Sequence, residues 1–318
     1  MKLEDIGFYT LSDERALSST MSTPLQRCEL ILTDSCNFNC VYCRGLRDDI
    51  AGTMELEQAK KTIKLWIDEG LTNVRFSGGE PLMFKGLIEL VEMCKNGNVK
   101  HIAVSSNGSF PWRLYERLID AGVNDFSISL DSGCCSIGEA QAGGIKGSWQ
   151  KVVDNIKLLS ERVYTTVGMV FTEDTVDRCV EDVEFAASLG VADIRVIPSA
   201  QFNQALSRLR DLSPELLDRF PILRYRIRNL LDGVSIRGIA ENNTDRCRLV
   251  LDDMAVAKGK HFPCIIYMRE GGDAIGDVGP NMRLERKQWM ESHEPAKDKI
   301  CSVMCLDVCT AFNKCAAR

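Results

Sequence analysis

Apolar runs alternate with amphipathic stretches between residues 28 and 200, and this alternation constrains the fold more than any other feature of the chain. Several runs are almost continuous in Ile, Val, Leu and Phe, as is typical of strands covered on both faces. The predicted strands are 28–33, 73–77, 101–105, 125–130, 165–171 and 193–197, and the predicted helices lie near 54–69, 85–96, 112–121, 147–161 and 177–189. Six such repeats predict an α/β fold whose parallel sheet curls into a partial (βα)6 TIM-like barrel. We expect the active site at the C-terminal ends of these strands.

The pattern changes after about residue 205. A charged helical stretch at 214–229 leads to a predicted β-hairpin of residues 249–256 and 261–266, which turns at Lys258-Gly259. A glycine-rich loop and a polar helix follow. The chain is therefore expected to comprise an N-terminal extension (1–27), a barrel (28–205) and a small C-terminal α+β domain (206–318).

The composition narrows the classes of function. Hydrophobic residues make up 45% of the 318 residues, which allows a sizeable core and argues against disorder. A net charge of −6 gives no sign of a nucleic-acid-binding surface, and no apolar run reaches the roughly 18–20 residues that span a bilayer. The N-terminal residues contain no apolar segment of the kind found in secretory signals, so we expect a cytoplasmic protein. Fourteen cysteines in a reducing compartment favour metal binding over disulfides.

Three cysteines form a tight group in the loop after the first predicted strand: Cys36, Cys40 and Cys43. Thiolates are soft ligands that suit zinc or iron–sulfur clusters. Structural zinc usually takes four protein ligands, whereas this group offers three and no nearby histidine. A [4Fe–4S] cluster held by three thiolates leaves one iron free to bind a substrate or cofactor. A zinc knuckle completed by a distant cysteine and plain buried cysteines are the alternatives.

The spacing Cys-x-x-x-Cys-x-aromatic-Cys, with Tyr42 as the aromatic residue, resembles the signature of the radical S-adenosylmethionine (SAM) superfamily. Gly78-Gly79-Glu80-Pro81, after the second strand, resembles the Gly-Gly-Glu-Pro motif that receives the methionine amino group in this family; by itself such a sequence is usually an ordinary turn. The resemblance assigns the SAM carboxylate, ribose and adenine to residues at later strand ends, namely Ser105, Asn107, Ser127, Ser129, Asp131 and Ile197. Polar capping of strand ends is the alternative for the polar members of this set.

The resemblance covers about residues 28–200 and implies an enzyme with a [4Fe–4S] cluster and SAM as cofactors. In this family the open iron binds the amino and carboxylate groups of SAM. One electron from the reduced cluster then breaks a carbon–sulfur bond, and the resulting 5′-deoxyadenosyl radical abstracts hydrogen from the substrate. The same resemblance implies a flavodoxin- or ferredoxin-like electron donor as a partner.

Six further cysteines occupy the last quarter of the chain: Cys247, Cys264, Cys301, Cys305, Cys309 and Cys315. The spacing from Cys247 through Gly259 to Cys264 resembles the start of the auxiliary-cluster domains called SPASM and, in shortened form, twitch. The tail departs from the full SPASM pattern, and six cysteines are too few for two fully protein-ligated clusters. We therefore expect one auxiliary [4Fe–4S] cluster, held by Cys247, Cys264 and two of the four tail cysteines. A structural zinc site is the alternative.

The adjacent pair Cys134-Cys135 follows Asp131 after two intervening residues, above the fourth predicted strand. A thiol there is a candidate hydrogen-atom donor to a product radical, although cysteine often serves only as a small buried hydrophobe. Domains of the SPASM type accompany oxidation or cross-linking of peptides, oxidation of sugars, and some redox-neutral epimerisations. The first hypothesis is therefore a peptide-modifying oxidoreductase or maturase. An enzyme acting on a sugar, aminoglycoside or nucleoside is the second, and a non-catalytic iron–sulfur or zinc protein is the third.

Overall fold

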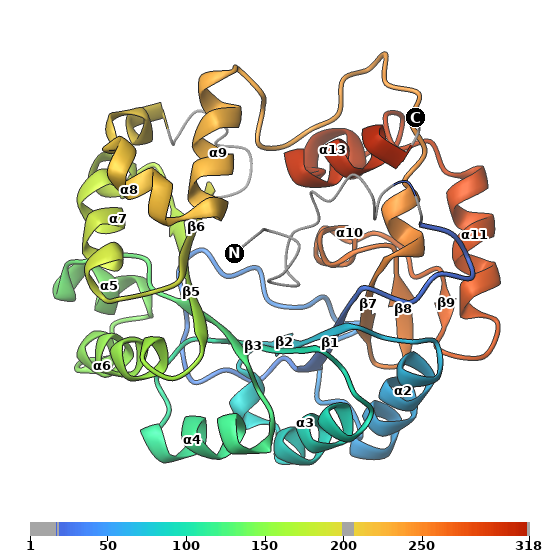
Figure 1. The fold of residues 1–318 in the computed structure, drawn as a ribbon, viewed down its shortest axis with the longest axis horizontal. Helices are drawn as coiled ribbons and strands as arrows, with labels where there is room; N and C mark the ends of the chain where they lie inside the picture. The colour runs from blue at the N-terminus through green and yellow to red at the C-terminus, as the bar shows by residue number, and fades with distance from the viewer. Residues whose placement is uncertain (1–16, 18, 199–206, 317–318) are drawn as a thin grey trace. The chain divides into compact units, whose positions relative to one another are not determined.

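The computed structural model describes residues 17, 19–198 and 207–316 (Figure 1). Most of the predicted N-terminal extension, residues 1–16 and 18, therefore lies outside the described part. The chain divides into two compact units, one of Met1–Ser35, Gly45–Ala103 and Arg237–Arg318, the other of Cys36–Arg44 and Val104–Ile236. Among the described residues, no helix has both the length and the apolar character needed to cross a membrane.

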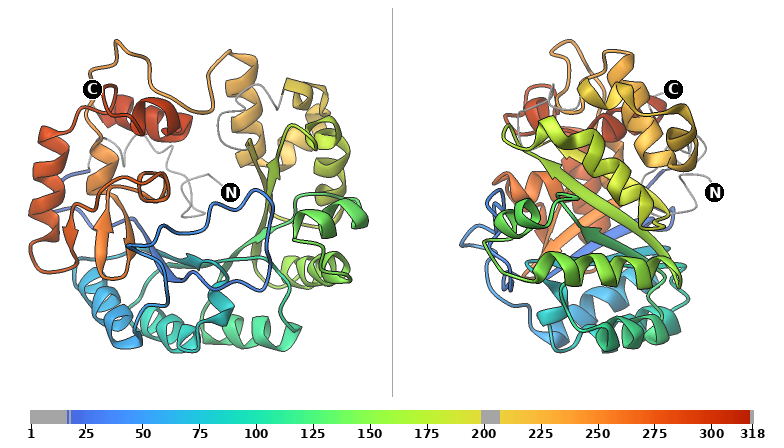
Figure 2. Two further views of the ribbon diagram at one scale, coloured as in Figure 1. Left: turned by 180° about the vertical axis from the view of Figure 1, so that it is seen from behind. Right: turned by 90° about the vertical axis from the view of Figure 1, so that its left-hand side faces the viewer.

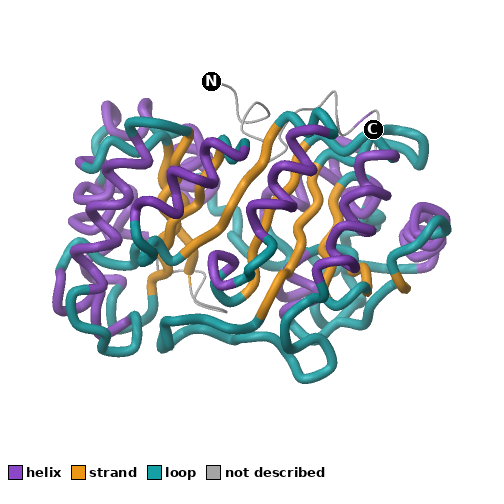
Figure 3. Tube along the Cα trace, turned by 90° about the horizontal axis from the view of Figure 1, so that it is seen from below, coloured by secondary structure: helices purple, strands orange, loops and turns teal. Residues whose placement is uncertain are grey.

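The first unit is built on β1 (Arg27–Thr33), which pairs in parallel with β2 (Asn73–Gly78) on one side and with β7 (Asp253–Ala257) on the other. The sheet then continues through β8 (Lys260–Phe262) and β9 (Gly276–Asp277), both of which pair antiparallel with their neighbours. Helices α2 (Leu56–Asp68) and α3 (Leu87–Asn96) pack against each other, and α2 also packs against β1. Figure 3, the view from below, shows helices in front of the strands of the sheet. The fully buried Trp66 of α2 reaches β7, where its indole N–H donates to the sulfur of Met254.

The second unit contains the parallel strands β4 (Asp125–Ser129), β5 (Tyr164–Phe171) and β6 (Asp193–Pro198). Helix α6 (Ser148–Ser160) packs against β5, and helix α7 (Cys179–Ser188) packs against β6 (Figure 2). The helices of this unit are α4 (Trp112–Ala121), α5 (Cys135–Gln141), α6 (Ser148–Ser160), α7 (Cys179–Ser188), α8 (Pro214–Arg219) and α9 (Pro221–Leu231). Strand β3 (His101–Ser106) contains the boundary between the units, and the strand order is β6-β5-β4-β3-β2-β1-β7-β8-β9.

The C-terminal part of the first unit is small and mixes helices with the β7–β8 hairpin. Its helices are η5 (Arg248–Leu251), α10 (Ile265–Arg269), α11 (Met282–Ser292), α12 (Cys301–Met304) and α13 (Asp307–Ala316). The fully buried Arg286 of α11 connects these elements. Its guanidinium donates to backbone carbonyls of η5, of the two hairpin strands and of the residue after β8, namely Val250, Asp253, Phe262 and Pro263. A buried guanidinium needs such partners, since an unpaired one would be costly.

The predicted α/β class is confirmed, with a largely parallel sheet and a small cysteine-bearing C-terminal region. Each of the six predicted strands is present, with ends within one residue of those expected. The hairpin turn at Lys258-Gly259 is also present, and both residues have positive φ, 46° and 74°, as a two-residue hairpin turn of this kind requires.

The expected ends of the hairpin strands are wrong. Residues 248–251 form the 3₁₀ helix η5, and β7 begins only at Asp253. Strand β8 ends at Phe262, because Pro263 has no N–H to continue the ladder and Cys264 already caps α10. The helical stretch predicted at 214–229 is two helices, which are separated at Phe220 because Pro221 starts a new helix.

Candidate active site and cysteine clusters

The three thiols of the first cysteine group share one loop. Cys36 and Cys43 are exposed and Cys40 is half-buried, and the N–H of Cys43 donates to the carbonyl of Cys40 at 3.0 Å in a tight turn. Burial, the carboxylate of Asp131 and the two neighbouring thiols raise the pKa of Cys40 to about 12. Thiols that raise one another's pKa in this way are best stabilised as thiolates by a positively charged metal centre. The donor set therefore fits the iron–sulfur cluster that the sequence predicts.

The cysteine loop is fastened to the C-terminal end of α5. The N–H groups of Asn39 and Val41 donate to the carbonyls of Ala142 and Gln141, at 3.1 and 3.2 Å. At Gly143 a Cβ atom would lie 2.9 Å from the carbonyl oxygen of Asn39, so a glycine is required where the two backbones meet. Helix α5 was not among the predicted helices, yet it supports the loop that carries the thiols.

Tyr42, the aromatic residue of the signature, fixes the loop to the end of β4. Its hydroxyl donates to Oδ2 of Asp131 at 2.5 Å, and Oδ1 of Asp131 accepts from the N–H of Val170 at 2.8 Å. Burial raises the pKa of Asp131 to about 6, although both hydrogen bonds act to lower it. Burial and the Asp131 carboxylate raise the pKa of Tyr42, so this hydroxyl stays protonated and remains a donor. Asp131 therefore positions the cysteine loop, while its expected role at the SAM ribose stays a prediction.

Asn107, in the loop after β3, provides a second attachment. Its Nδ2 donates to Oδ1 of Asn37 at 2.8 Å and lies 3.8 Å from the sulfur of Cys36. Its Oδ1 accepts from the hydroxyl of Ser109 at 2.7 Å. The amide predicted to bind SAM thus also orients the first thiol of the group.

The other strand-end residues differ in how open they are to a ligand. Ser129 is exposed at the end of β4, whereas Ser127 is buried and its hydroxyl accepts from the guanidinium of Arg195 at 2.9 Å. Ser105 and Ile197 are half-buried near the ends of β3 and β6. The predicted SAM contacts of these four residues are not tested by this geometry, and Ser129 offers the freest hydroxyl.

Gly78 and Gly79 let two backbone segments approach each other closely. Gly78 has a φ of 143°, and a Cβ there would lie 2.2 Å from the carbonyl oxygen of Thr33. At Gly79 a Cβ would lie 2.4 Å from the carbonyl oxygens of both Asp34 and Ser35. These glycines therefore pack against Thr33–Ser35, the segment that leads in the chain to Cys36.

The rest of this motif is buried and hydrogen-bonded. Glu80 is fully buried, and its carboxylate accepts from the N–H of Leu82 at 3.1 Å at the start of the 3₁₀ helix η2 (Pro81–Met83). Arg269 of α10 donates to the carbonyls of Gly78 and Gly45, at 3.3 and 3.4 Å. Arg269 was not predicted from the sequence, since no local pattern marks a contact across 191 residues.

The second cysteine group also comes together. Burial and the thiol of Cys309 raise the pKa of Cys247 to about 11, and the same two causes raise the pKa of Cys264. The interaction between the thiols of Cys305 and Cys309 raises the pKa of Cys305 and lowers that of Cys309. The thiol of Cys305 also donates to the carbonyl of Leu306 at 3.8 Å. Burial, Cys247 and Cys264 raise the pKa of Cys301. Cys315 packs with Cys247 and Cys309 against a small apolar cluster of Leu249, Phe312 and Ala316. This region therefore gathers more than enough thiols for one four-iron cluster.

Cys134 and Cys135 lie at the start of α5 instead of in an open loop. Cys134 is the N-cap residue and half-buried, whereas Cys135 is exposed. Hydrogen bonds from the hydroxyl of Ser136 and the N–H of Ile137 lower the pKa of Cys134, while desolvation and the carboxylate of Glu139 raise that of Cys135. The two adjacent thiols are therefore chemically distinct, and the hydrogen-donor role predicted for them stays a prediction.

Comparison with known proteins identifies the family. Residues 30–186 match the model of the radical SAM superfamily. The chain carries a radical SAM domain. The GTP 3′,8-cyclase of Helicobacter pylori strain J99 is 28% identical over 257 residues, which cover 74% of this chain and 79% of that protein. The GTP 3′,8-cyclase of Pelotomaculum thermopropionicum is 28% identical over 281 residues, which cover 80% of this chain and 85% of that protein.

Solved structures share the fold of this radical SAM protein. Streptococcus suis SuiB bound to the precursor peptide SuiA superposes with a TM-score of 0.59 at 14% identity, over 91% of this chain and 76% of that one. The enzyme anSMEcpe with bound AdoMet gives a TM-score of 0.59 at 16% identity, over 91% of this chain and 95% of that one. The match to the radical SAM model confirms the predicted family and its cofactors, a [4Fe–4S] cluster and SAM. The C-terminal cysteines support an auxiliary cluster. The individual ligands stay predictions.

Proposed function

We propose that this radical SAM enzyme cleaves SAM reductively, using a [4Fe–4S] cluster held by Cys36, Cys40 and Cys43, and abstracts hydrogen from its substrate. The cysteine loop carries the proposal, because three thiols on one short loop are held by Tyr42 and Asn107. The cluster, when bound, supplies the electron that breaks the carbon–sulfur bond of SAM.

The chain's own residues would bind and orient the reacting groups. The three thiolates would ligate three irons and leave the fourth open to SAM. The Gly78–Pro81 turn would offer backbone carbonyls to the methionine ammonium, while Ser129 would present a hydroxyl at the edge of the sheet. Tyr42 would keep the loop in register with the strand ends, since its hydroxyl stays protonated.

The test is metal and product analysis of the anaerobically reconstituted protein. Replacing Cys36, Cys40 and Cys43 with alanine should remove four irons per chain and abolish 5′-deoxyadenosine formation, with the auxiliary iron retained. Cys94→Ala, which removes a buried cysteine of α3, is the control and should keep both. Zinc as the sole metal of the reconstituted wild-type protein would overturn the proposal.

For the substrate, a peptide is our first proposal, with net oxidation or cross-linking as the outcome. The support is the group of C-terminal cysteines, since an auxiliary cluster of the resembled type could accept the electron that leaves the product radical. This makes the enzyme an oxidoreductase or maturase. Hydrogen return from Cys134 or Cys135 would instead give epimerisation.

A purine nucleotide is the second candidate, favoured by the relatives named GTP 3′,8-cyclase, which match about three quarters of the chain. The two candidates differ in a direct assay. GTP, or a short precursor peptide encoded beside the gene, is added to the reduced enzyme with SAM. The amount of 5′-deoxyadenosine is then measured relative to the amount formed without substrate. A stoichiometric product from GTP would exclude the peptide proposal, and no response to GTP would exclude the nucleotide.

A further inference from the structure

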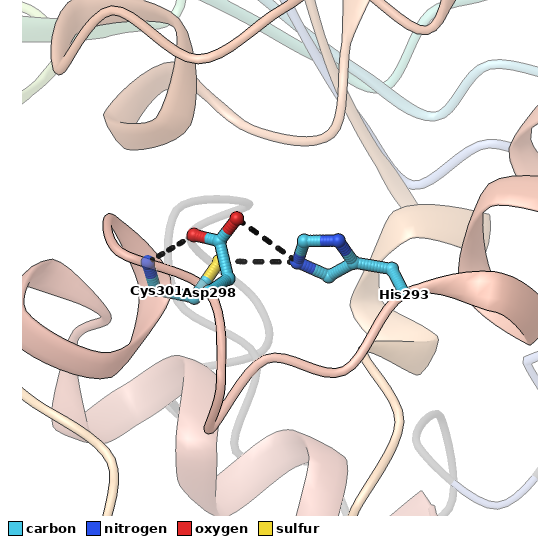
Figure 4. A group of neighbouring side chains, drawn as sticks. All are labelled: His293, Asp298 and Cys301. Carbon is cyan, nitrogen blue, oxygen red and sulfur yellow. Dashed lines mark hydrogen bonds and ion pairs between the residues drawn. The ribbon is translucent and has the colours of Figure 1, made fainter.

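Three side chains of types that bind metals lie close together in the C-terminal region, and the proposed function assigns no role to this group of three. His293 follows α11, Asp298 lies in the next loop, and Cys301 begins α12. Figure 4 shows the three side chains directed toward one another. Nε2 of His293 lies 3.7 Å from Sγ of Cys301 and 3.9 Å from Oδ2 of Asp298, and all three donor atoms lie within 4.8 Å of one another.

These separations suit one tetrahedral metal ion. Ligand atoms lie about 2.0–2.3 Å from zinc, so two donors that share the ion are roughly 3.3–3.8 Å apart. The distances from His293 to Cys301 and Asp298 are close to this range. Imidazole nitrogen, carboxylate oxygen and thiolate sulfur are the donor types that zinc takes, whereas Mg²⁺ and Ca²⁺ prefer oxygen alone.

The surroundings hold these side chains in place. Trp289 stacks on the ring of His293 with centroids 3.9 Å apart, and Tyr267 packs edge-on against both rings. The hydroxyl of Tyr267 donates to Oδ2 of Asp298 at 3.2 Å, and the N–H of Cys301 donates to Oδ1 at 2.7 Å. Contacts of this kind orient the ligands of protein metal sites.

The cysteine inventory leaves Cys301 available. A fully protein-ligated four-iron cluster takes four thiolates, and the sequence predicts Cys247, Cys264 and two tail cysteines. Cys305 interacts with Cys309, and both Cys305 and Cys301 interact electrostatically with Cys247 and Cys264. What distinguishes Cys301 is its imidazole neighbour, since its Sγ lies 3.7 Å from Nε2 of His293. Assigning Cys305 and Cys309 to the auxiliary cluster therefore leaves Cys301 for a second metal.

We propose that His293, Asp298 and Cys301 bind one zinc ion, with water in the fourth coordination position. The ion would tie the end of α11 to the start of α12, next to the auxiliary cluster. The proposal rests on Cys305 and Cys309 as the tail ligands of that cluster. It does not depend on the substrate or on SAM cleavage.

The experiment uses the full-length protein with its clusters, supplied with zinc sulfate under anaerobic conditions. We expect one zinc per chain, and X-ray absorption at the zinc edge should show one sulfur and three nitrogen or oxygen ligands. Asp298→Asn keeps a side-chain oxygen that can accept from the N–H groups of Ile300 and Cys301, yet removes the anionic ligand. Asp298→Asn and His293→Gln should each lose the zinc and keep all the iron. Glu294→Gln, which changes an exposed carboxylate beside His293, should keep the zinc.

Three results would overturn this site. A zinc shell of four sulfurs, or variants that lose four irons, would assign these residues to the cysteine cluster. Wild-type protein that takes up no zinc would exclude the site outright. Failure of SAM cleavage with the zinc result intact would instead contradict only the proposed function.

Discussion

Gly79→Ala tests whether the Gly-Gly-Glu-Pro turn positions the cysteine loop. The added Cβ would lie 2.4 Å from the carbonyl oxygens of Asp34 and Ser35, whereas real Cβ contacts essentially never fall below 3.0 Å. The obstructing atoms are backbone, so they cannot move aside as a flexible side chain could. Either the Gly78-Gly79 backbone or the Asp34-Ser35 backbone must therefore shift away from the other. A shift of Ser35 would also move Cys36, the next residue in the chain.

The magnitude follows from this overlap. Forced overpacking of a well-packed region costs about 1–3 kcal/mol. If the displacement is passed to the first thiol, SAM affinity should fall by about 5- to 150-fold, since each 1.4 kcal/mol is about a factor of ten. The assays are SAM binding to the reconstituted protein and thermal unfolding of the same sample.

The matched control is Gly279→Ala. Gly279 also lacks a positive φ, and its nearest atom to a new Cβ is 3.9 Å away, an ordinary contact. This variant should therefore bind SAM and unfold as the wild type does. Equal SAM affinity and equal melting temperature in Gly79→Ala would refute the argument that the close approach of backbones supports the site.

Three further results are expected. The buried His261 donates to Glu285 and accepts from Arg286, and burial lowers its pKa to about 4. The unfolded chain, with an ordinary pKa near 6.5, then binds the proton more readily, so stability should fall by about 2–3 kcal/mol as pH drops from about 6.5 to about 4. In His261→Gln, urea unfolding should show a flatter pH dependence. Tyr42→Phe should cost about 1–2 kcal/mol of loop anchoring and speed iron loss to a chelator. For a hydrogen-donor site, product made in D₂O should carry one solvent deuterium, and Cys134→Ala or Cys135→Ala should lose that product yet still form 5′-deoxyadenosine.

Each of these has a contradicting outcome. An unchanged pH slope in His261→Gln would mean that other groups set the acid lability. Iron retention in Tyr42→Phe equal to the wild type would show that the backbone bonds to α5 suffice. Normal turnover in both cysteine variants would make the pair structural and favour oxidation through the auxiliary cluster.

The sequence predicted the parallel strands well because their signal is local. A strand buried on both faces needs a continuous apolar run, and its ends are marked by the polar residues that follow. The turn at Lys258-Gly259 was equally visible, since it needs two residues that tolerate positive φ. Helix α5 had no such signal, because its seven residues include Gly138 and show no amphipathic period. Trp149 packs where a Cβ of Gly138 would be, at 2.4 Å, so tertiary contact holds this helix.

The site could be predicted where the same residue is needed both for ligand binding and for packing. Gly78 and Gly79 match a family motif, and they are also the residues that the backbone of Thr33–Ser35 can accept at that distance. A motif that is constrained by both the ligand and the packing is easily recognised in the sequence. Arg269 and His293 contact other segments of the chain, and local spacing does not reveal these contacts. Other residue types at these positions would also be compatible with the local backbone. Their roles therefore emerge only from the folded arrangement, where one guanidinium reaches Gly78 and one imidazole reaches Cys301.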